Sequence, residues 1–264
     1  MAKEQIQIRD FELFYDIVKS LTKMAEGIKF IIDENGLVVY AKNDYSKCNL
    51  SSNCVYSNIC VEFCIADLST LVKIFTTVKD MYRDTYDSVK IFYEKPFLKI
   101  ESGKFKTKVA ACDEQRVLKF ISTKIKTELT PKIEFTTSSN MIKTINSHSF
   151  IFQDSASARI YITTESDMQN NTIFATIGNE DNELANSATL ELGLINSGSL
   201  LKDDGSAMKV IIDFNRLNIL NMVPSEEIKV MIANERPVLV SKITKEGKNG
   251  SYFTVDICSF MMVR

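Results

Sequence analysis

Two similar segments, EKPFLKI (94–100) and ERPVLVSKI (235–243), lie about 141 residues apart in the chain. Each follows an apolar strand-like segment, an aspartate and an amphipathic stretch of about a dozen residues. The aspartates, Asp67 and Asp213, stand where a helix N-cap is expected, because their carboxylates can accept the unpaired amides of the first helical turn. The two segments therefore predict a duplicated unit of strand, helix and hairpin.

The same order of elements occurs twice more. Residues 6–25 and 132–147 each have the pattern of a strand, a capping residue and a helix. Four such units make an α+β fold of two similar domains, each with two helices packed on antiparallel sheets. We predict an N-terminal domain over residues 1–118, an extended connector over 119–132 and a C-terminal domain over 133–264. A short helix in the connector region is a second possibility.

The composition is that of a soluble globular protein. Of the 264 residues, 45% are hydrophobic and 25% are charged, and no uninterrupted apolar run reaches the roughly 18 residues of a membrane span. The first 25 residues carry acids and no small-residue cleavage site, so we do not expect a signal peptide. We expect a cytoplasmic protein of a bacterial or infected host cell, or a nuclear one if the source is eukaryotic. The net charge of −2 neither indicates nor excludes nucleic-acid binding, because the placement of charge decides it.

Cysteine is the residue type that raises the question of a metal. Four of the six cysteines fall within seventeen residues, but their spacing contains no C-x-x-C pair, and the one histidine is distant. Zinc sites use closely spaced pairs, so the sequence favours buried or surface thiols and predicts no metal and no other cofactor. The cysteines are Cys48, Cys54, Cys60, Cys64, Cys112 and Cys258.

Catalytic motifs are absent from the sequence. It contains no G-x-x-x-x-G-K, no G-x-G-x-x-G and no G-x-S-x-G, and His148 has no recognisable nucleophile or acid partner. Catalysis by carboxylates alone is not excluded, but no pattern indicates it. We therefore expect a protein that is not an enzyme.

The duplicated architecture and the chain length resemble those of DNA sliding clamps of the proliferating-cell-nuclear-antigen type. The resemblance covers the whole chain as architecture and is residue-specific over roughly the last 50 positions. Similar residues fall where the family pattern has them at Leu217-Asn218, Ala233, Pro237, Val240, Lys242-Ile243 and Tyr252-Phe253. The chain looks like a divergent member, of a virus or a phage.

The resemblance implies a function without catalysis. Clamps of this type form closed rings, usually homotrimers, that encircle double-stranded DNA and tether the replicative DNA polymerase for processive synthesis. The implied partners are duplex DNA, bound weakly and without sequence preference, a DNA polymerase, an ATP-driven clamp loader and further copies of the chain. No membrane partner is implied.

The helices of such a ring face the DNA with their polar sides. Helical spacing buries two apolar stripes: Phe11, Phe14, Val18, Leu21 and Ala25 in one helix, and Leu68, Leu71, Phe75 and Val78 in the next. The basic residues expected to face the DNA are Lys19, Lys23, Lys73, Lys143 and Arg216. Glu12 and Asp16 share the outer face of the first helix and offset its lysines, so these faces could equally be ordinary solvated surfaces.

Two further surfaces follow from the resemblance. Subunits would pair through the edge strands 104–111 and 188–195, of which one is basic and the other acidic. The interface residues would be Phe105, Thr107, Val109, Leu190, Leu192 and Leu194. Partner peptides would dock in a pocket between the domains, lined by Leu129, Pro131, Pro237, Phe253 and Met261. Ordinary exposed strands and a simple closing strand are the alternatives.

Two other functions compete with the closed ring. One is a viral structural or scaffold protein made of duplicated β domains, which would also form rings. The other is a processivity factor that holds DNA as a monomer or dimer without closing. The positions of Lys19, Lys73 and Lys143 distinguish a scaffold protein from a clamp, because a clamp requires these lysines to line a common channel.

Overall fold

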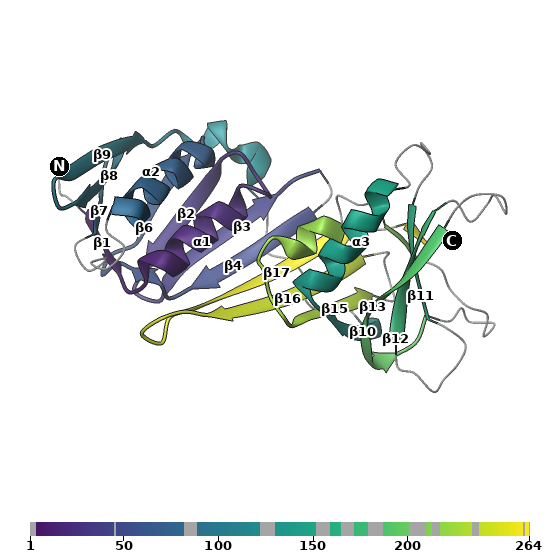
Figure 1. The fold of residues 1–264 in the computed structure, drawn as a ribbon. Helices are drawn as coiled ribbons and strands as arrows, with labels where there is room; N and C mark the ends of the chain where they lie inside the picture. The colour runs from purple at the N-terminus through teal and green to yellow at the C-terminus, as the bar shows by residue number, and fades with distance from the viewer. Residues whose placement is uncertain are drawn as a thin grey trace. The chain divides into compact units, whose positions relative to one another are not determined.

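A computed structural model defines the fold, and Figure 1 gives the element labels used below. The chain divides into unit 1, Met1–Ile125 with Thr244–Asp256, and unit 2, Lys126–Ile243 with Ile257–Arg264. Within the described part of the chain, no helix is long and apolar enough to cross a membrane. The described residues are 4–44, 46–81, 89–121, 130–151, 159–164, 172–178, 187–200, 210–212, 217–233, 238–260 and 262–263.

Unit 1 contains two antiparallel sheets. The first has the strand order β5-β1-β7-β8-β9, and in the second β4 lies between β17 and β3, followed by β2 and β6. The strands are β1 (Glu4–Ile8), β2 (Ile28–Asp33), β3 (Gly36–Lys42), β4 (Ser46–Ser52), β5 (Val55–Tyr56), β6 (Val61–Ile65), β7 (Lys90–Glu94), β8 (Phe97–Ser102) and β9 (Phe105–Ala110). β17 (Tyr252–Phe260) enters this unit with its residues 252–256.

Two helices, α1 (Phe11–Leu21) and α2 (Leu68–Met81), lie side by side on the sheets of unit 1 (Figure 1). Their apolar stripes are buried as the spacing predicted, and the ring of Phe75 packs against those of Phe11 and Phe14 at centroid distances of 5.3 and 5.4 Å. Both helices start at the expected aspartates. Asp10 accepts a hydrogen bond from the Leu13 amide, and Asp67 accepts one from the Thr70 amide.

The segment after β9 is not simply extended. Two short 3-10 turns, η2 (Glu114–Arg116) and η3 (Leu118–Phe120), follow one another, and the Val117 side chain between them is fully buried. Lys29 of β2 binds Glu114 at 3.3 Å and Glu62 at 2.8 Å. These contacts attach the segment just before the predicted connector to unit 1. The short helix that was the second possibility is present here as 3-10 turns, of which η3 reaches the start of the connector.

Unit 2 repeats the arrangement of unit 1. One sheet contains β18-β14-β11-β12-β13, and β13 continues into a second sheet through β10, β15 and β16. Helix α3 (Ser139–Ile151) lies against β12 and β13 and buries Ile142 and Ile145 (Figure 1). The strands are β10 (Pro131–Thr137), β11 (Arg159–Thr164), β12 (Thr172–Gly178), β13 (Ser187–Gly198), β14 (Val210–Ile212), β15 (Ile228–Ala233), β16 (Val238–Glu246) and β18 (Met262–Val263).

The strand orders of the two units confirm the duplication. The order β5-β1-β7-β8-β9 in unit 1 corresponds to β13-β10-β15-β16-β17, and β4-β3-β2-β6 corresponds to β13-β12-β11-β14. The long strand β13 therefore plays two parts: residues 187–194 pair with β12 as β4 pairs with β3, and residues 194–198 pair with β10 as β5 pairs with β1. The predicted α+β fold of two similar antiparallel units is confirmed.

Three details bear on the predicted repeat. The first hairpin turns between Glu94 and Phe97 as expected, whereas the second turn, at 235–236, lies outside the described residues. Asp213 and the start of the expected fourth helix also lie outside them; the described remainder includes a 3-10 turn, η4 (Ile219–Asn221). The segment Thr244–Asp256 groups with unit 1 rather than with the C-terminal half in which the sequence placed it.

Candidate nucleic-acid and subunit interfaces

The polar side of α1 is a narrow stripe. Lys19 and Lys23 are exposed, and Glu12 and Asp16 are partly exposed on the same side of the helix. Within α1 the stripe spans about 10 Å from residue 12 to residue 19, at about 1.5 Å per residue, and Lys23 lies in the turn that follows the helix. The sequence predicted this face correctly, but it predicted that the two carboxylates would offset the lysines of α1 itself.

The structure pairs these carboxylates with lysines from elsewhere. Lys245 Nζ lies 2.6 Å from Asp16 Oδ2, and Lys248 Nζ lies 2.7 Å from Glu12 Oε2. Lys79 of α2 is 3.8 Å from the other oxygen of Glu12. The hydrogen bond from Lys248 lowers the pKa of Glu12, so this side chain stays ionised and its charge is compensated locally. No local pattern in the sequence signalled these contacts.

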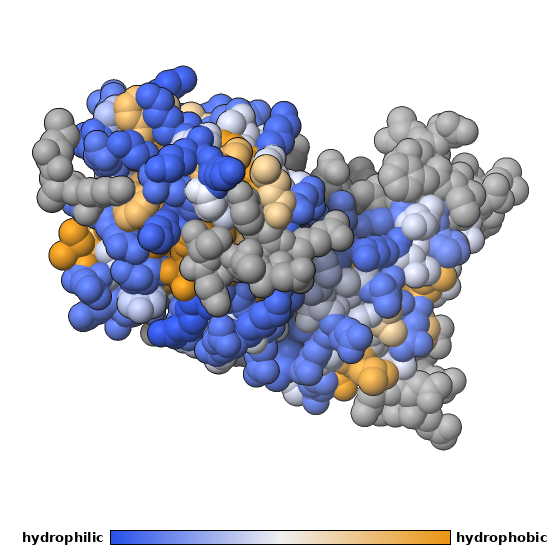
Figure 2. All heavy atoms as spheres, turned by 60° about the vertical axis from the view of Figure 1, so that its left-hand side comes forward, coloured by the Kyte–Doolittle hydropathy of each residue, from blue (hydrophilic) through white to orange (hydrophobic). Residues whose placement is uncertain are grey.

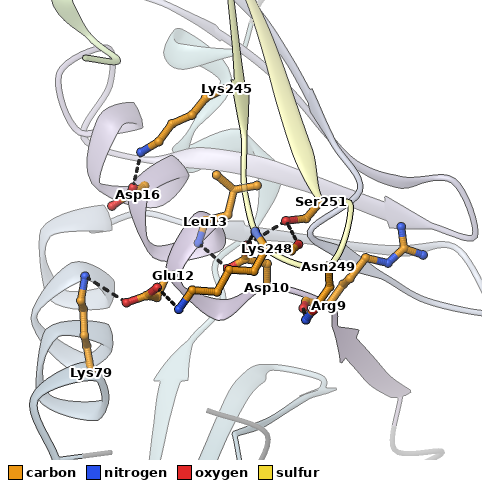
Figure 3. A network of polar contacts seen from close by, with 10 residues as sticks. All are labelled: Arg9, Asp10, Glu12, Leu13, Asp16, Lys79, Lys245, Lys248, Asn249 and Ser251. Atoms are coloured by element: carbon orange, nitrogen blue, oxygen red, sulfur yellow. Dashed lines mark hydrogen bonds and ion pairs between the residues drawn. The ribbon is translucent and has the colours of Figure 1, made fainter. Parts of the chain in front are cut away.

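Lys245 lies near the end of β16 and Lys248 in the turn between β16 and β17, and this hairpin tip reaches the start of α1 (Figure 3). One buried carboxylate holds this segment: Asp10 Oδ2 accepts hydrogen bonds from the Lys248 amide at 2.6 Å and from the Ser251 hydroxyl at 2.8 Å. Its other oxygen, Oδ1, caps α1 through the Leu13 amide at 2.9 Å. Asp10 therefore links the helix start and the hairpin tip.

The hairpin tip is closely fitted around Asp10. A Cβ at Gly247 would lie 2.5 Å from both Asp10 Oδ2 and Ser251 Oγ, so a side chain there would force the tip away. Asn249 and Gly250 take positive φ values of 55° and 67°, which Asn and Gly tolerate best. The amide of Gly247 donates to the Ser251 carbonyl at 2.9 Å and closes the loop. The position of Lys248 is thus set by backbone contacts as well as by its ion pair.

The other residues predicted to face DNA lie on different elements of the fold or outside the described residues. Lys73 is exposed on α2, on the side opposite the buried stripe, and Lys143 is exposed on α3 in unit 2. Arg216 lies outside the described residues. A shared channel for these lysines stays a prediction.

The predicted peptide pocket is described only in part. Leu129, Pro237 and Met261 lie outside the described residues, and Pro131 is exposed at the first position of β10. Phe253 is fully buried in unit 1, so its side chain belongs to the core and offers no surface to a peptide. The resemblance implied a surface role for Phe253, because the sequence alone does not show how β17 pairs with its neighbours and which of its faces is buried.

The predicted edge strand 104–111 contains β9, which ends its sheet in the described residues. The Ala111 amide donates to the Pro96 carbonyl at 2.7 Å, so the amides of residues 105, 107 and 109 point toward β8 in the antiparallel ladder. The amides of Lys106 and Lys108 consequently point to the open side. Phe105 and Thr107 are partly exposed, whereas Val109 is buried, which leaves it in the core of unit 1.

The face to the left of Figure 1, where β9 lies, comes forward in Figure 2. It is mostly hydrophilic, with small separate apolar patches rather than one extended apolar surface. Permanent interfaces built on side chains usually need a larger apolar area. A partner at this edge would therefore depend largely on backbone pairing.

The second predicted edge, residues 188–195, belongs to β13. The ladder to β12 shifts register between Ile173 and Phe174, which leaves Leu192 as an extra residue. As a result Leu190 is partly exposed and Leu192 fully buried, but Leu194 is 57% exposed. The sequence treated the three leucines as one alternating face, and this bulge separates Leu194 from the other two. Leu192 is thus a core residue and not a contact surface.

The cysteines are mostly part of the core. Cys48, Cys54, Cys64 and Cys258 are buried, and burial raises the pKa of Cys48 and of Cys54 to about 12 and that of Cys64 to about 11. Thiols with such pKa values stay protonated near neutral pH and are poor metal ligands and nucleophiles. Among the described residues, no three or more His, Cys, Asp or Glu side chains form a group that could hold a metal.

Comparison with known proteins gives a clear result for structure and none for sequence. No protein-family model matches the chain, and no curated protein matches it. The structure is similar to that of Proliferating Cellular Nuclear Antigen from Entamoeba histolytica, with a TM-score of 0.68, 13% identity and 98% of each chain covered.

Two further solved structures have the same fold. A. fulgidus PCNA with the C-terminal region of FEN-1 bound matches with a TM-score of 0.68 and 12% identity, over 98% of this chain and 99% of that one. PCNA from Thermococcus kodakaraensis matches with a TM-score of 0.65 and 11% identity, over 99% of this chain and all of that one. The resemblance predicted from the sequence is confirmed for the fold, along essentially the whole chain.

Proposed function

Because the chain has the fold of PCNA-type sliding clamps from end to end, we propose that it is a ring-forming sliding clamp. Copies of the chain assemble head to tail, most simply as a homotrimer, and encircle duplex DNA. The ring tethers a replicative polymerase and performs no catalysis. Its binding to DNA is weak and independent of sequence, because the topological link replaces tight contacts.

The observation that carries this proposal is the unequal use of equivalent strand edges in the two repeats. In unit 1 the edge of β4 is paired with residues of β17. In the order β13-β10-β15-β16-β17 of the second repeat, β17 is the outermost strand. The equivalents of β4 and β17 are residues 187–193 of β13 and strand β9. In the described residues, β9 pairs only with β8, so its other edge is open. Strand β10 pairs with β13 only from residue 194 of β13 onward, so the same edge of residues 187–193 is also open there.

Repeating the same pairing between two copies joins β9 of one to β13 of the next. The two edges are different surfaces, so this contact is heterologous and leads to a ring if the rotation closes. Lys106 and Lys108 lie in β9, Lys104 directly precedes it, and Glu191 lies on β13, which favours this pairing over that of like edges. Backbone pairing also explains how a mostly hydrophilic edge could hold a subunit.

The helices supply the surface for DNA in this proposal. Exposed lysines on α1, α2 and α3 face the phosphates, and the buried apolar stripes fix the helices on the sheets. Contacts of this kind release counterions, so the affinity should fall steeply with salt.

Partner proteins are part of the proposal as well. A. fulgidus PCNA was solved with the C-terminal region of FEN-1 bound, so a protein of this fold can hold a segment of another protein. By analogy we propose that a DNA polymerase docks a short peptide on this chain, and that an ATP-driven loader opens the ring. Pro131 is the predicted pocket residue whose exposure fits that role.

Topological retention tests the proposal. A linear duplex with biotin at both ends is incubated with the protein at low salt, and streptavidin is then added to block the ends. A closed ring should remain on the blocked duplex when salt is raised to dissociate electrostatic contacts, and it should leave after a restriction cut between the blocks. Equal loss from blocked and unblocked duplex would contradict a closed ring and favour a scaffold or an open processivity factor.

A further inference from the structure

We propose that the tip of the β16–β17 hairpin is part of the DNA-facing surface. Lys245 and Lys248 compensate the carboxylates of α1, so that this helix can approach the phosphate backbone. The inference rests on the proposed function and deepens it, because it names residues that lie on no helix. Asp10 is the positioning residue that holds the hairpin tip in place. The ligand class is the sugar–phosphate backbone of duplex DNA.

The hairpin lysines change the charge of the α1 surface. Glu12 and Asp16 lie on the same stripe as Lys19 and Lys23, and two unpaired carboxylates there would repel phosphates. Lys248 and Lys245 bind these carboxylates at 2.7 and 2.6 Å. Together with Lys19 and Lys23, the two hairpin lysines outnumber the two acids, so the stripe has a net positive charge.

Both hairpin lysines stay in contact with solvent. The Lys248 side chain is 67% exposed although its ammonium binds Glu12, so its charge lies where a phosphate can approach. Lys245 is 38% exposed beside Asp16. Lys79 adds a third cation near Glu12 and lies 5.1 Å from the ring of Tyr15. The cations form a row along α1, and a row suits a polyanion with about one charge per 1.7 Å of its axis.

Contacts with Asp10 hold the hairpin tip in one conformation. The backbone amide of Lys248 and the hydroxyl of Ser251 both donate to the buried Asp10 carboxylate. Gly247 allows this approach because a side chain there would collide with Asp10. A fixed backbone lowers the ordering cost when Lys248 meets a ligand. Figure 3 shows Lys245 and Lys248 extending from the hairpin to the exposed side of α1.

A matched pair of double variants tests the inference. Lys245→Ala with Lys248→Ala removes the two hairpin lysines. The control, Lys99→Ala with Lys229→Ala, removes two lysines that also bind carboxylates at similar exposure, Lys99 with Glu94 at 2.6 Å and Lys229 with Glu227 at 3.6 Å. Lys99 points away from the buried Leu98 and Ile100 of its strand. All four pairs are partly exposed, so both variants should keep the fold, which melting curves check.

Affinity for a fluorescent 30-bp duplex is measured by anisotropy over a salt series. The hairpin variant should bind about tenfold more weakly than the wild type near 0.1 M salt, and its salt slope should fall by about one to two, at roughly 0.9 per lost phosphate contact. Adding Glu12→Gln and Asp16→Asn should restore part of the affinity, because the repelling charges are then gone. The control should bind within about twofold of the wild type, since its lysines lie off the helical surface.

The outcomes separate this inference from the proposed function. If the wild type is retained on end-blocked duplex and the hairpin variant binds like the control, the hairpin inference is overturned and the clamp stands. If the neutralising substitutions restore nothing although the hairpin variant is weak, the charge-compensation argument is overturned. If the wild type itself is not retained, the proposed function fails.

Discussion

Strand β4 of unit 1 and residues 187–193 of β13 in unit 2 are equivalent edges, but they differ in whether a further strand pairs with them in the described residues. The edge of β4 is paired with β17, and side chains reinforce the pairing: Ser52 Oγ donates to the Tyr252 carbonyl at 2.6 Å, and Asn53 Oδ1 accepts from the Tyr252 amide at 2.7 Å. The edge of β13 has no such strand within the described residues. The edge that is paired within the chain in one repeat is the edge that we propose to pair with a neighbouring copy in the other.

The covered edge also differs in its anchoring. The hairpin tip that leads into β17 is tied to α1 through Asp10, whereas the equivalent turn of unit 1, at residues 103–104 between β8 and β9, contains no extra loop. The anchored tip also carries lysines to the helix surface. The closed edge therefore belongs to the fold of unit 1 and leads to the candidate DNA surface, whereas we propose that the open edge serves assembly.

The largest effect is expected from a proline at the open edge. Lys108→Pro removes an amide that points away from β8, so unit 1 should keep its ladder while β9 loses a donor for a second strand. A lost backbone hydrogen bond costs about 1 kcal/mol, and the proline ring adds a steric clash at every subunit contact. We expect the assembly to dissociate at least tenfold more readily, measured by sedimentation over a dilution series.

Two controls sharpen this test. Lys108→Ala removes the same charge but keeps the amide, so it should leave most of the assembly intact. Thr107→Pro removes an amide that bonds to β8, so it should destabilise unit 1 itself, seen as a lower melting temperature. If Lys108→Pro assembles like the wild type, β9 is not the subunit edge.

The next effect is expected at the anchored tip. Asp10→Ala removes the cap of α1 and leaves the Lys248 amide without its acceptor, so the free energy of unfolding should fall by about 2–4 kcal/mol. Asp10→Asn keeps an oxygen for capping and should lose less. Urea denaturation measures both. A loss in Asp10→Ala no larger than that of an ordinary exposed cap would contradict the linking role of this carboxylate.

The smallest effect is expected at the equivalent cap of α2. Asp67 is exposed and binds the hydroxyl and the amide of Thr70, at 2.6 and 3.0 Å, so Asp67→Ala should cost about 1 kcal/mol. The Thr70 hydrogen bonds lower the pKa of Asp67 below its ordinary value of 3.8. Its stabilising contribution is therefore complete well above pH 3.8 and is lost as the pH falls through the lowered pKa.

Urea titrations of the wild type and Asp67→Ala between pH 7 and pH 2.5 check this sign. The difference in unfolding free energy should be constant near neutrality and shrink in acid. A difference that grows in acid would show that the aspartate is not stabilised in its charged form.

Local patterns in the sequence predicted much of the fold. The strand–aspartate–helix pattern predicted α1 and α2 with their caps at Asp10 and Asp67. Helical spacing predicted their buried stripes. The exposed stripe of Glu12, Asp16, Lys19 and Lys23 followed from the same periodicity. These features depend on residues within a few positions of one another, which is the range that propensity and periodicity describe.

Long-range contacts and register were not accessible in this way. The bonds from Asp10 to Lys248 and Ser251 join residues more than 200 positions apart, and no pattern near either end indicates them. The bulge at Leu192 changes the face of Leu194 because β12 and β13 shift register, which depends on two strands at once. Phe253 is buried for a related reason: the pairing of β17 decides which of its faces enters the core.

The most direct test of the central claim is the mass of the wild-type protein in solution, measured by light scattering over a dilution series. A closed head-to-tail ring predicts a discrete, concentration-independent mass, near three times 29.9 kDa for the trimer. A mass of 29.9 kDa at every concentration would contradict ring closure through β9 and β13.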